Sequence, residues 1–529
     1  MRITFVALGW EQMGISLLSA IAKRDGHEVN LAFSTSLFND RWNMGFPAIS
    51  PYFDDTKEVI ETIKKQKPDV LCFSALTGTY QWMLGAAKEV KLHLPNVKTV
   101  FGGVHVSAVP ERVLAQPQVD YVVVGEGEVA FPEILKAIER DGPGGPIVNT
   151  RFKWPDGQII KGEQAGFIQD LDSLPYYDKT LWEDHIILGD EYQTIAARGC
   201  PYRCTFCFNN FFAKLPEGKS GKFVRQRSVE HMMGELLWAK KRYHLRMIFF
   251  QDDVFTVNKK WLKEFLPRYK KEIGVPFECL THPVYLDDDV SQWLSDAGCI
   301  YVEMGIQTMD DKYKFETIKR YEKSKDVEKA MDLMHKYRLR AKVHHMFGLP
   351  DEPLEAQEKA RELYVKYPPY RIGTFWTTFL PGTEMVHQAL ELGLIDLAGI
   401  ERINDGLEFD FYRDSIKIKD LKKLKAYKAY EVIFKLIPIM PGFIRKRLKP
   451  ENIYWIPNPV LTGLTFLIDV CLYLILGDHG HKVYAKHYLY HLSRIFLRKF
   501  GIKLPAPTRL QPSQPTKIIT PKAETVSVQ

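Results

Sequence analysis

Three of the seven cysteines lie in one short stretch of the chain, as Cys200, Cys204 and Cys207. A loop with the spacing C-x3-C-x2-C can turn three thiolates toward one point. Soft thiolate ligands favour iron–sulfur clusters, and three of them suit a four-iron four-sulfur cluster with one iron left open. A structural zinc site normally has four closed ligands, so zinc is the weaker alternative, followed by three unrelated buried cysteines. The next cysteines along the chain are distant: Cys72, Cys279 and Cys299.

The residues around the three cysteines support the cluster. Residues 193–197 are predicted to form a strand that leads directly into the cysteine loop, and the aromatic Phe206 precedes the last cysteine. This segment resembles the signature of the radical S-adenosylmethionine (SAM) enzymes. The resemblance implies that SAM binds the open iron through its amino and carboxylate groups, near Phe206. It also implies that an electron from the cluster cleaves SAM to a 5′-deoxyadenosyl radical.

Length and composition limit the possible architectures. A chain of 529 residues is long enough for two or three domains. Few cysteines without a disulfide framework favour a reducing, cytoplasmic compartment. Residues 9–12 interrupt the first apolar run too early for a signal peptide. The expected order is a ligand-binding domain (1–140), a linker with a small hairpin (141–184), a barrel (185–400), a helical domain (401–503) and a disordered tail (504–529).

Short apolar runs alternate with helical patterns in the first 140 residues, which predicts an α/β doubly wound (Rossmann-like) parallel sheet. Small residues follow three of these strands, at 9–14, 74–78 and 102–105. Ligands of such sheets bind beyond the carboxyl ends of the strands, and small residues let a bulky ligand approach the backbone. The alternative is a nucleotide-like fold that binds no ligand, or a different one.

The three strand ends resemble those of cobalamin-binding domains, whose pattern is D-x-H-x-x-G, then S-x-L, then G-G. The second and third elements match, but Gly9 and Glu11 stand where Asp and His would be, so bound cobalamin would lack an axial histidine from this loop. His105 either contacts the cofactor or forms a hydrogen bond within its loop. The cobalamin contacts implied by the resemblance are Glu11, Gly14, Ser74, Leu76, Thr77, Gly102, Gly103, His105, Gly125, Glu126 and Gly127.

Six longer strand–helix units follow the linker and predict a partial or complete barrel with its site at the carboxyl ends of the strands. The family resemblance implies a partial TIM-type (β/α)6 barrel. The expected strands are residues 193–197, 247–251, 277–282, 301–307, 342–347 and 372–378.

Polar residues at these strand ends are candidates for SAM binding. Asp252 and Asp253 either hold SAM's amino group or cap the following helix. By the period of two, Glu303 and Gln307 share one strand face, which argues for a ligand inside the barrel. His344 and His345 point to opposite faces, so at most one faces the site. The contacts implied by the resemblance are Phe206, Asp252, Asp253, Glu303, Gln307 and Gly348; no catalytic residue is assigned.

The C-terminal region is strongly basic. Residues 416–503 carry 17 Lys or Arg and five acidic residues, a net charge of +12 in a chain of +7. Residues 460–476 are mostly apolar but too short, and interrupted by Asp469, for a confident membrane span. The segment is therefore either a buried helix or part of a peripheral membrane surface at the inner face of the membrane.

The sequence as a whole is identified as a cobalamin-dependent radical SAM enzyme. The resemblance implies methylation of an unactivated carbon by methylcobalamin, with an electron donor such as flavodoxin or ferredoxin. A hydrophobic or amphipathic substrate, lipid or tetrapyrrole-like, fits the basic and apolar C-terminal region. The alternatives are a radical cyclase or rearrangement enzyme, a tRNA methylthiotransferase, and a cluster- or zinc-bearing interaction module. Nucleic acid is not an expected partner, because the C-terminus lacks a β-rich RNA module.

Overall fold

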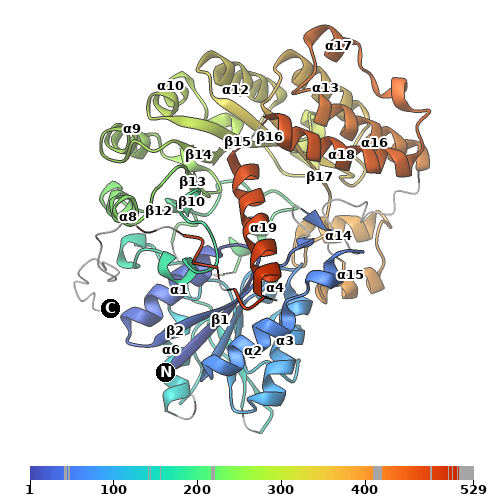
Figure 1. Ribbon diagram of the computed structural model, residues 1–529. Coiled ribbons are helices and arrows are strands. Elements are labelled where there is room, and N and C mark those ends of the chain that lie inside the picture. The colour runs from blue at the N-terminus through green and yellow to red at the C-terminus, as the bar shows by residue number, and fades with distance from the viewer. Residues whose placement is uncertain are drawn as a thin grey trace.

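The computed structural model contains two parallel sheets, one in each half of the molecule, and a helical C-terminal region beside them (Figure 1). The structure describes residues 1–510 except 41–43, 46–47, 141, 143, 155, 216–220, 409–419, 477–478, 499, 503 and 509. The predicted α/β class and order of sheets are confirmed. The domain boundaries stay a prediction.

The N-terminal sheet has the strand order β2-β1-β5-β6-β7-β8-β9, with the last two strands antiparallel. Its strands are almost continuously apolar because helices cover both faces, α1 and α6 on one and α2 and α3 on the other. The strands are β1 (Arg2–Leu8), β2 (Glu28–Ser34), β5 (Val70–Ser74), β6 (Lys98–Gly102), β7 (Tyr121–Val123), β8 (Thr150–Lys153) and β9 (Ile159–Lys161). The helices are α1 (Met13–Arg24), α2 (Thr56–Gln66), α3 (Tyr80–His93), α4 (Val104–Ala108), α5 (Pro110–Leu114) and α6 (Ala130–Glu139). A short ribbon pairs β3 (Asn39–Asp40) with β4 (Met44–Gly45). The hairpin predicted in the linker forms as β8 and β9 and joins the edge of this sheet.

The second sheet contains the six predicted barrel strands in sequence order. They are β10 (Tyr192–Thr194), β13 (Ile248–Phe250), β14 (Phe277–Thr281), β15 (Cys299–Gln307), β16 (Arg340–Phe347) and β17 (Arg371–Trp376). The helices around them are α8 (Val229–Arg242), α9 (Lys259–Arg268), α10 (Asp288–Asp296), α11 (Asp311–Glu316), α12 (Ser324–Lys336), α13 (Glu355–Lys366), α14 (Glu384–Glu391) and α15 (Leu397–Asn404). A two-stranded ribbon, β11 (Ala197–Arg198) with β12 (Arg225–Gln226), flanks the cysteine loop. The first predicted strand, 193–197, is therefore divided between β10 and β11.

Accessibility alternates along the barrel strands with the period of two. On β15, Val302, Met304 and Ile306 are buried in the core beneath the helices, whereas Glu303 and Gln307 are half-buried. The neighbouring strands repeat this pattern, because the side chains between the core positions point into the barrel. The inward side chains therefore line an interior that the chain does not fill completely. We call this space the lumen; its half-buried lining includes Gln193, Phe249, Leu280, Glu303, Gln307, His344, Met346 and Phe375.

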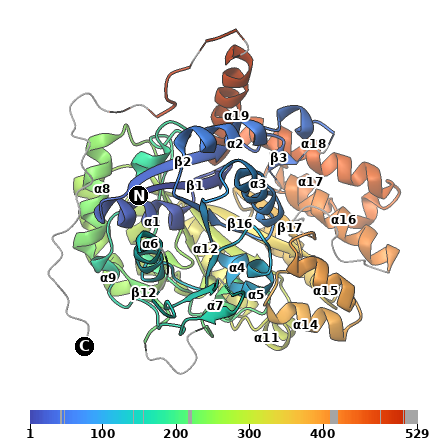
Figure 2. The same ribbon diagram turned by 90° about the horizontal axis from the view of Figure 1, so that it is seen from below.

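The C-terminal helices bind different parts of the molecule. Helix α16 (Leu421–Leu436) packs on β17 and α13, and α18 (Asn458–Leu476) packs on α16. Figure 2 shows α16, α17 (Gly442–Arg447) and α18 together on one side of the molecule, and the short α17 lies at the outer edge in Figure 1. Helix α19 (His479–Arg498) crosses from the barrel to the N-terminal sheet (Figure 1). Within the described ranges, no helix is long and apolar enough to cross a membrane.

The end of the described chain is ordered further than the sequence predicts. Disorder is expected from Leu504 on, but the Thr508 hydroxyl accepts a hydrogen bond from the Leu188 amide at 3.1 Å, and Leu510 pairs with Tyr243. These contacts attach the segment to the start of the barrel. The rest of the predicted tail lies outside the described residues.

Candidate functional site

The cysteine loop connects β11 to the short helix α7 (Phe208–Phe212). The Cys207 amide donates to the Cys204 carbonyl at 3.1 Å, which forms the turn between the second and third cysteines. Gly199 opens the loop with φ +86°, and a Cβ there would lie 2.3 Å from the Phe223 carbonyl oxygen, so only glycine fits. The loop conformation is thus fixed by backbone contacts as well as by the cysteines.

The three thiols lie close enough to influence one another. Burial, with a smaller contribution from neighbouring cysteines, raises the pKa of Cys200 to about 11 and that of Cys207 to about 12. Thiols with a raised pKa keep their protons at neutral pH. They become thiolates only when a strongly positive group, such as iron, takes the place of the proton. Among the described residues, no three His, Cys, Asp or Glu side chains converge as ligands of one metal ion. In a four-iron cluster each thiolate binds its own iron, so a set of three soft donors on one loop fits the cluster.

The two candidate aspartates after β13 have different environments. The Asp252 carboxylate is buried and accepts the amides of Ala196 at 3.1 Å and Ala197 at 2.5 Å. It thereby fixes the strand that leads into the cysteine loop. Asp253 is exposed and accepts from the Asn209 side chain at 2.9 Å, on the helix that follows Cys207. Of the two, only Asp253 has an accessible carboxylate to offer to SAM.

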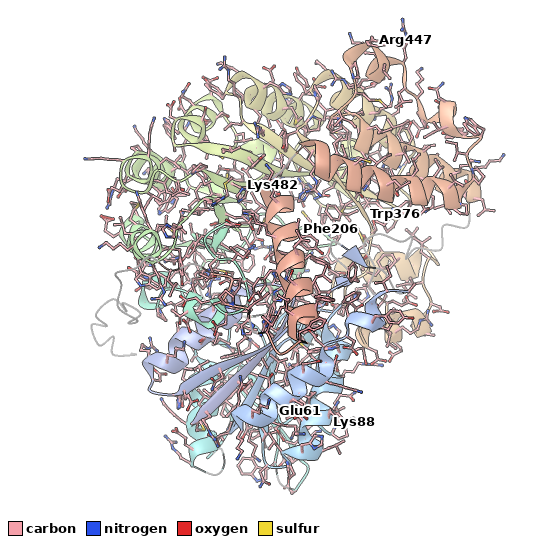
Figure 3. All side chains as sticks on the ribbon, in the orientation of Figure 1. Glu61, Lys88, Phe206, Trp376, Arg447 and Lys482 are labelled. Carbon is pink, nitrogen blue, oxygen red and sulfur yellow. The ribbon has the colours of Figure 1, made fainter. Side chains whose placement is uncertain are left out.

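The other SAM candidates lie around the mouth of the barrel. Gln307 ends β15 with φ +64°, next to an irregularity in the pairing with β16. A non-glycine residue in this region is strained, and such strain concentrates at functional sites. Gly348, with φ +71°, follows β16, and Phe206 packs against the apolar cluster that contains Leu349 and Phe379. Figure 3 shows Phe206 between the two halves of the molecule. The structure therefore brings these three residues to one end of the barrel.

Deeper in the lumen lies a group of charged side chains. Lys342 on β16 donates to both carboxylate oxygens of Glu278 on β14, at 2.7 and 2.9 Å. Glu303 lies 3.8 Å from Lys342 and 3.7 Å from His344. Burial and the neighbouring Glu303 raise the pKa of Glu278. Glu303 is four residues before Gln307, about 13 Å down the strand at 3.3 Å per residue. This position favours contact with a substrate in the lumen over contact with SAM at the mouth.

The two adjacent histidines of β16 point to opposite sides, as predicted. His344 is half-buried and faces Glu303, whereas His345 is fully buried and bonds to Tyr364 and Gln357 at 3.0 and 2.7 Å. Only His344 faces the lumen.

Glycines leave room at the strand ends of the N-terminal sheet. A Cβ at Gly9 or Gly14 would meet no heavy atom within 4 Å, and one at Gly102 would meet only Val123, at 3.8 Å. Gly103, with φ +98°, lies against the backbone of Ala75, where a Cβ would be 2.7 Å from the carbonyl oxygen. Ser74 and Leu76 stand half-buried at the neighbouring strand end. This open, small-residue edge fits a large flat ligand such as cobalamin.

Glu11, the residue in the axial histidine position, is held by protein groups. Its carboxylate accepts from Lys179 Nζ at 2.6 Å and from Ser16 Oγ at 2.8 Å, and the pair is almost fully buried. Lys179 also donates to the Gln193 carbonyl of β10 at 2.5 Å. Glu11 therefore joins the ligand-binding edge to the barrel, and the described part of the loop offers no histidine.

The predicted glycine-rich turn at 125–128 also joins the two halves. Glu126 pairs with Arg198 at 3.0 Å and Arg225 at 2.8 Å, and Glu128 pairs with Arg198 at 2.6 Å. Gly125, with φ +82°, donates its amide to Ser107 Oγ, and Gly127 packs on Leu18. The carboxylates thus face the ribbon beside the cysteine loop, and the glycines shape the turn.

His105 and Thr77 bond to each other and are buried. His105 Nδ1 lies 3.2 Å from Thr77 Oγ1, and its ring packs on Tyr80. Burial lowers the pKa of His105 to about 4. Gly406 covers them, since a Cβ there would lie 2.8 Å from the Thr77 carbonyl oxygen. His105 therefore bonds to the loop that follows β5, and its contact with the cofactor stays a prediction.

Sequence reasoning missed several buried charged residues of the site. Glu278 and Lys342 are charged residues inside otherwise apolar strands. A charged residue at such a position could have been recognised from the sequence as a candidate for the site. Lys179, Arg198 and Arg225 have no local signal, because their partners are far away in the chain. The same holds for a buried group beneath the cysteine loop: His282, Lys314, Arg320 and Glu322.

Two family models match this chain. The B12 binding domain matches residues 3–135, which contain the N-terminal strand ends. The Radical SAM superfamily matches residues 194–363, which contain the cysteine loop and most of the barrel. The matched families therefore coincide with the two sites described above.

Several curated proteins are similar over most of the chain. An uncharacterised methyltransferase of Pyrococcus horikoshii is 26% identical over 72% of this chain and 82% of its own length. An anaerobic magnesium-protoporphyrin IX monomethyl ester cyclase of Rubrivivax gelatinosus is 23% identical over 68% and 62%. A hopanoid C-3 methylase of Methylococcus capsulatus is 25% identical over 73% and 70%.

A solved structure has the same fold. The cobalamin-dependent SAM radical enzyme OxsB, with aqua-cobalamin and SAM bound, aligns with a TM-score of 0.61 and 14% identity over 93% of this chain and 75% of its own. With both family models and both sites in place, the cofactors are a four-iron four-sulfur cluster, SAM and cobalamin. The chain belongs to the cobalamin-dependent radical SAM enzymes.

Proposed function

We propose that this enzyme methylates an unactivated carbon of a hydrophobic or amphipathic substrate. When bound, the cluster with SAM supplies a radical that removes a substrate hydrogen, and cobalamin supplies the methyl group. The observation that carries the proposal is that two ion pairs join the cobalamin edge to the other half of the molecule. The buried Glu11–Lys179 pair reaches β10, and the partly buried Glu126–Arg225 pair reaches the ribbon beside the cysteine loop. This joining holds the two candidate sites at a fixed separation, as transfer between two cofactors through one substrate requires.

The lumen supports an amphipathic substrate. Its half-buried walls include Phe249, Leu280, Met346 and Phe375, which would pack on an apolar body. Among them, Glu303 offers carboxyl oxygens and lies 3.7 Å from His344 Nε2. We assign Glu303 to a polar end of the substrate, and Asp253, Gln307, Gly348 and Phe206 to SAM.

Two observations favour methyl transfer over the alternatives. Relatives over most of the chain are named as methyltransferases or methylases, although one is named as a cyclase. The C-terminal region consists of helices α16 to α19, whereas a tRNA methylthiotransferase would carry a β-rich RNA module there. Cyclisation or rearrangement of the substrate remains the second candidate function, supported by the relative named as a cyclase.

Product analysis separates these functions. Anaerobically reconstituted enzyme, reduced by flavodoxin, ferredoxin or dithionite, is supplied with SAM carrying a deuterated methyl group and with candidate lipids or tetrapyrroles. Methyl transfer places deuterium in the substrate, whereas cyclisation changes the substrate mass without label. A product that contains no label, formed only by enzyme with intact cysteines, would replace the methyl-transfer proposal with the second candidate.

We also propose that the enzyme meets its substrate at an anionic membrane surface. Helix α17 and the turn after it form a patch, the basic tip, which consists of the exposed Phe443, Ile444, Lys446, Arg447, Lys449 and Trp455 and the half-buried Arg445. Phe443 is 65% exposed and Trp455 79% exposed. Figure 3 shows Arg447 at the outer edge of the molecule. Aromatic residues among basic ones fit an anionic bilayer interface, at roughly 1 kcal/mol per basic residue near the surface.

Vesicle flotation tests the basic tip. The protein should float with vesicles that contain phosphatidylglycerol but not with phosphatidylcholine alone, and salt should weaken binding. The triple variant R445Q/K446Q/R447Q should lose most of the binding. The matched control changes three exposed lysines, two of α2 and one at its C-terminal cap, as K57Q/K65Q/K67Q, and should bind like the unchanged protein. If both triple variants bind vesicles equally well, the membrane contact lies on another surface of the protein. If the unchanged protein binds no vesicles, the proposed membrane contact is wrong.

A further inference from the structure

A buried ionic group lies directly beneath the cysteine loop. Arg320 donates to Glu322 at 2.8 Å, Lys314 Nζ lies 3.5 Å from the same carboxylate, and His282 Nε2 lies 3.2 Å from it. The side chains of Lys314 and Glu322 are 0% exposed. The charged groups are therefore shielded from water. In this low-dielectric environment their electrostatic effect on neighbouring groups is larger than it would be in water.

Two contacts attach this group to the cysteine loop. The Tyr202 ring, between the first two cysteines, stacks on His282 with ring centroids 3.8 Å apart. The buried Thr205, next to Cys204, donates its amide to the Ile318 carbonyl at 3.2 Å. Arg320 also donates to the Gly305 carbonyl at 2.8 Å, beside the strained Gln307. The ionic group thus lies between the cluster ligands and the end of β15.

The charges of this group do not cancel. Burial lowers the pKa of His282 to about 4, so the ring is neutral at pH 7. Burial opposes ionisation of Glu322, but Arg320, His282 and Lys314 outweigh it and hold the pKa of Glu322 well below its usual range. Burial lowers the pKa of Lys314, and the neighbouring Glu322 carboxylate opposes that shift. With Lys314 protonated, Arg320 and Lys314 carry two positive charges against the one negative charge of Glu322. Asp311, the other carboxylate that acts on Lys314, is exposed and screened by water.

We propose that this surplus positive charge raises the reduction potential of the cluster held by Cys200, Cys204 and Cys207. A cluster gains one negative charge when it accepts an electron, so a buried cation beside its ligands stabilises the reduced form. Arg320 acts most directly, because its guanidinium lies beside the Cys204 thiol. The inference rests on the cluster of the proposed function and requires no substrate.

Redox titration followed by electron paramagnetic resonance tests the proposal in the reconstituted full-length protein, with dithionite as the electron source. Lys314→Met keeps the shape of the side chain and should lower the cluster potential. Glu322→Gln removes the opposing charge and should raise it. Lys312→Met is the matched control, because Lys312 lies on the same helix but is 81% exposed, and its potential should not shift.

The signs of the shifts separate a charge effect from a structural one. A purely structural role would lower iron content or move both potentials in the same direction. If Lys314→Met does not hold iron, Arg320→Gln and Arg320→Lys provide a second pair of variants. The cluster potential of Arg320→Lys should lie closer to that of the unchanged protein than the potential of Arg320→Gln does. Unshifted potentials, or shifts of equal sign in the Lys314 and Glu322 variants, overturn the proposal. Because no substrate is present, loss of methyl transfer does not affect this outcome.

Discussion

The two candidate sites of this molecule are formed by different kinds of residue. The N-terminal edge uses glycines and small side chains, and its carboxylates, Glu11 and Glu126, are turned toward the barrel. The barrel instead concentrates charges, with Lys342, Glu278 and Glu303 in the lumen below its edge. The first edge can recognise a ligand by shape and backbone contact, and the second by charge. Ligand recognition in the N-terminal half therefore depends on the space that small residues leave open, and in the barrel it depends on charged side chains.

Removal of a cluster ligand should have the largest effect. Cys207→Ser removes one of three thiolates at the barrel edge, and we expect loss of the cluster and of SAM cleavage. The unchanged protein should hold about four irons per chain after reconstitution. Cys471→Ser is the control, because Cys471 is exposed on α18, and it should keep full iron content. Stoichiometric zinc without iron in the unchanged protein would contradict the cluster.

A methyl group at Gly103 should damage the N-terminal edge next most severely. The added Cβ of Gly103→Ala would lie 2.7 Å from the Ala75 carbonyl oxygen, at a φ of +98° that alanine disfavours. We expect loss of cobalamin binding, measured by absorbance after gel filtration, and destabilisation by more than about 1 kcal/mol. Gly85→Ala is the control, because it adds the same methyl group at a position where the new Cβ would meet no heavy atom within 4 Å. It should leave the free energy of unfolding unchanged or raise it by up to about 1 kcal/mol. Normal cobalamin uptake by Gly103→Ala would show that the edge tolerates movement.

The buried pair between the edges should give an intermediate effect. Lys179→Met leaves the Glu11 carboxylate buried without its cation, which costs about 3–5 kcal/mol. Urea unfolding should show this loss, and a second change, Glu11→Gln, should restore part of it. Lys136→Met breaks only the exposed pair with Glu133 and should cost no more than about 1 kcal/mol. A small effect of Lys179→Met would mean that the two halves are not joined here.

The sequence predicted the parts of this structure that local patterns determine. Both sheets, all six barrel strands and the three cysteines follow from periodicity and spacing. The division of Asp252 and Asp253 between a structural and an accessible role could not be predicted, because it depends on where Ala197 and Asn209 lie. The buried ionic group beneath the loop was also invisible, since Lys314 and Glu322 are ordinary helix and loop residues until the fold encloses them. Long-range pairing, not composition, decides these positions.

The smallest expected effect concerns the cover over the N-terminal edge. Helix α19 covers Trp10, whose ring stacks on His487 at 4.7 Å, and His491 Nε2 lies 2.9 Å from the His185 carbonyl oxygen. Burial lowers the pKa of His487 to about 3 and that of His491 to about 4. Both rings are therefore neutral when the helix is docked, but a detached helix would titrate near the unfolded value of about 6.5.

The sign of the pH dependence follows from these values. As pH falls below 6.5, the detached helix binds protons that the docked helix does not, so docking weakens by up to about 1.4 kcal/mol per pH unit for each histidine. Hydrogen exchange should show faster opening of α19 at pH 5.5 than at pH 7.5, relative to α1 and after correction for intrinsic rates. His487→Phe keeps the ring stack and removes one titrating group, so it should reduce this difference. Equal protection of α19 at both pH values would show that the two histidines do not control its docking.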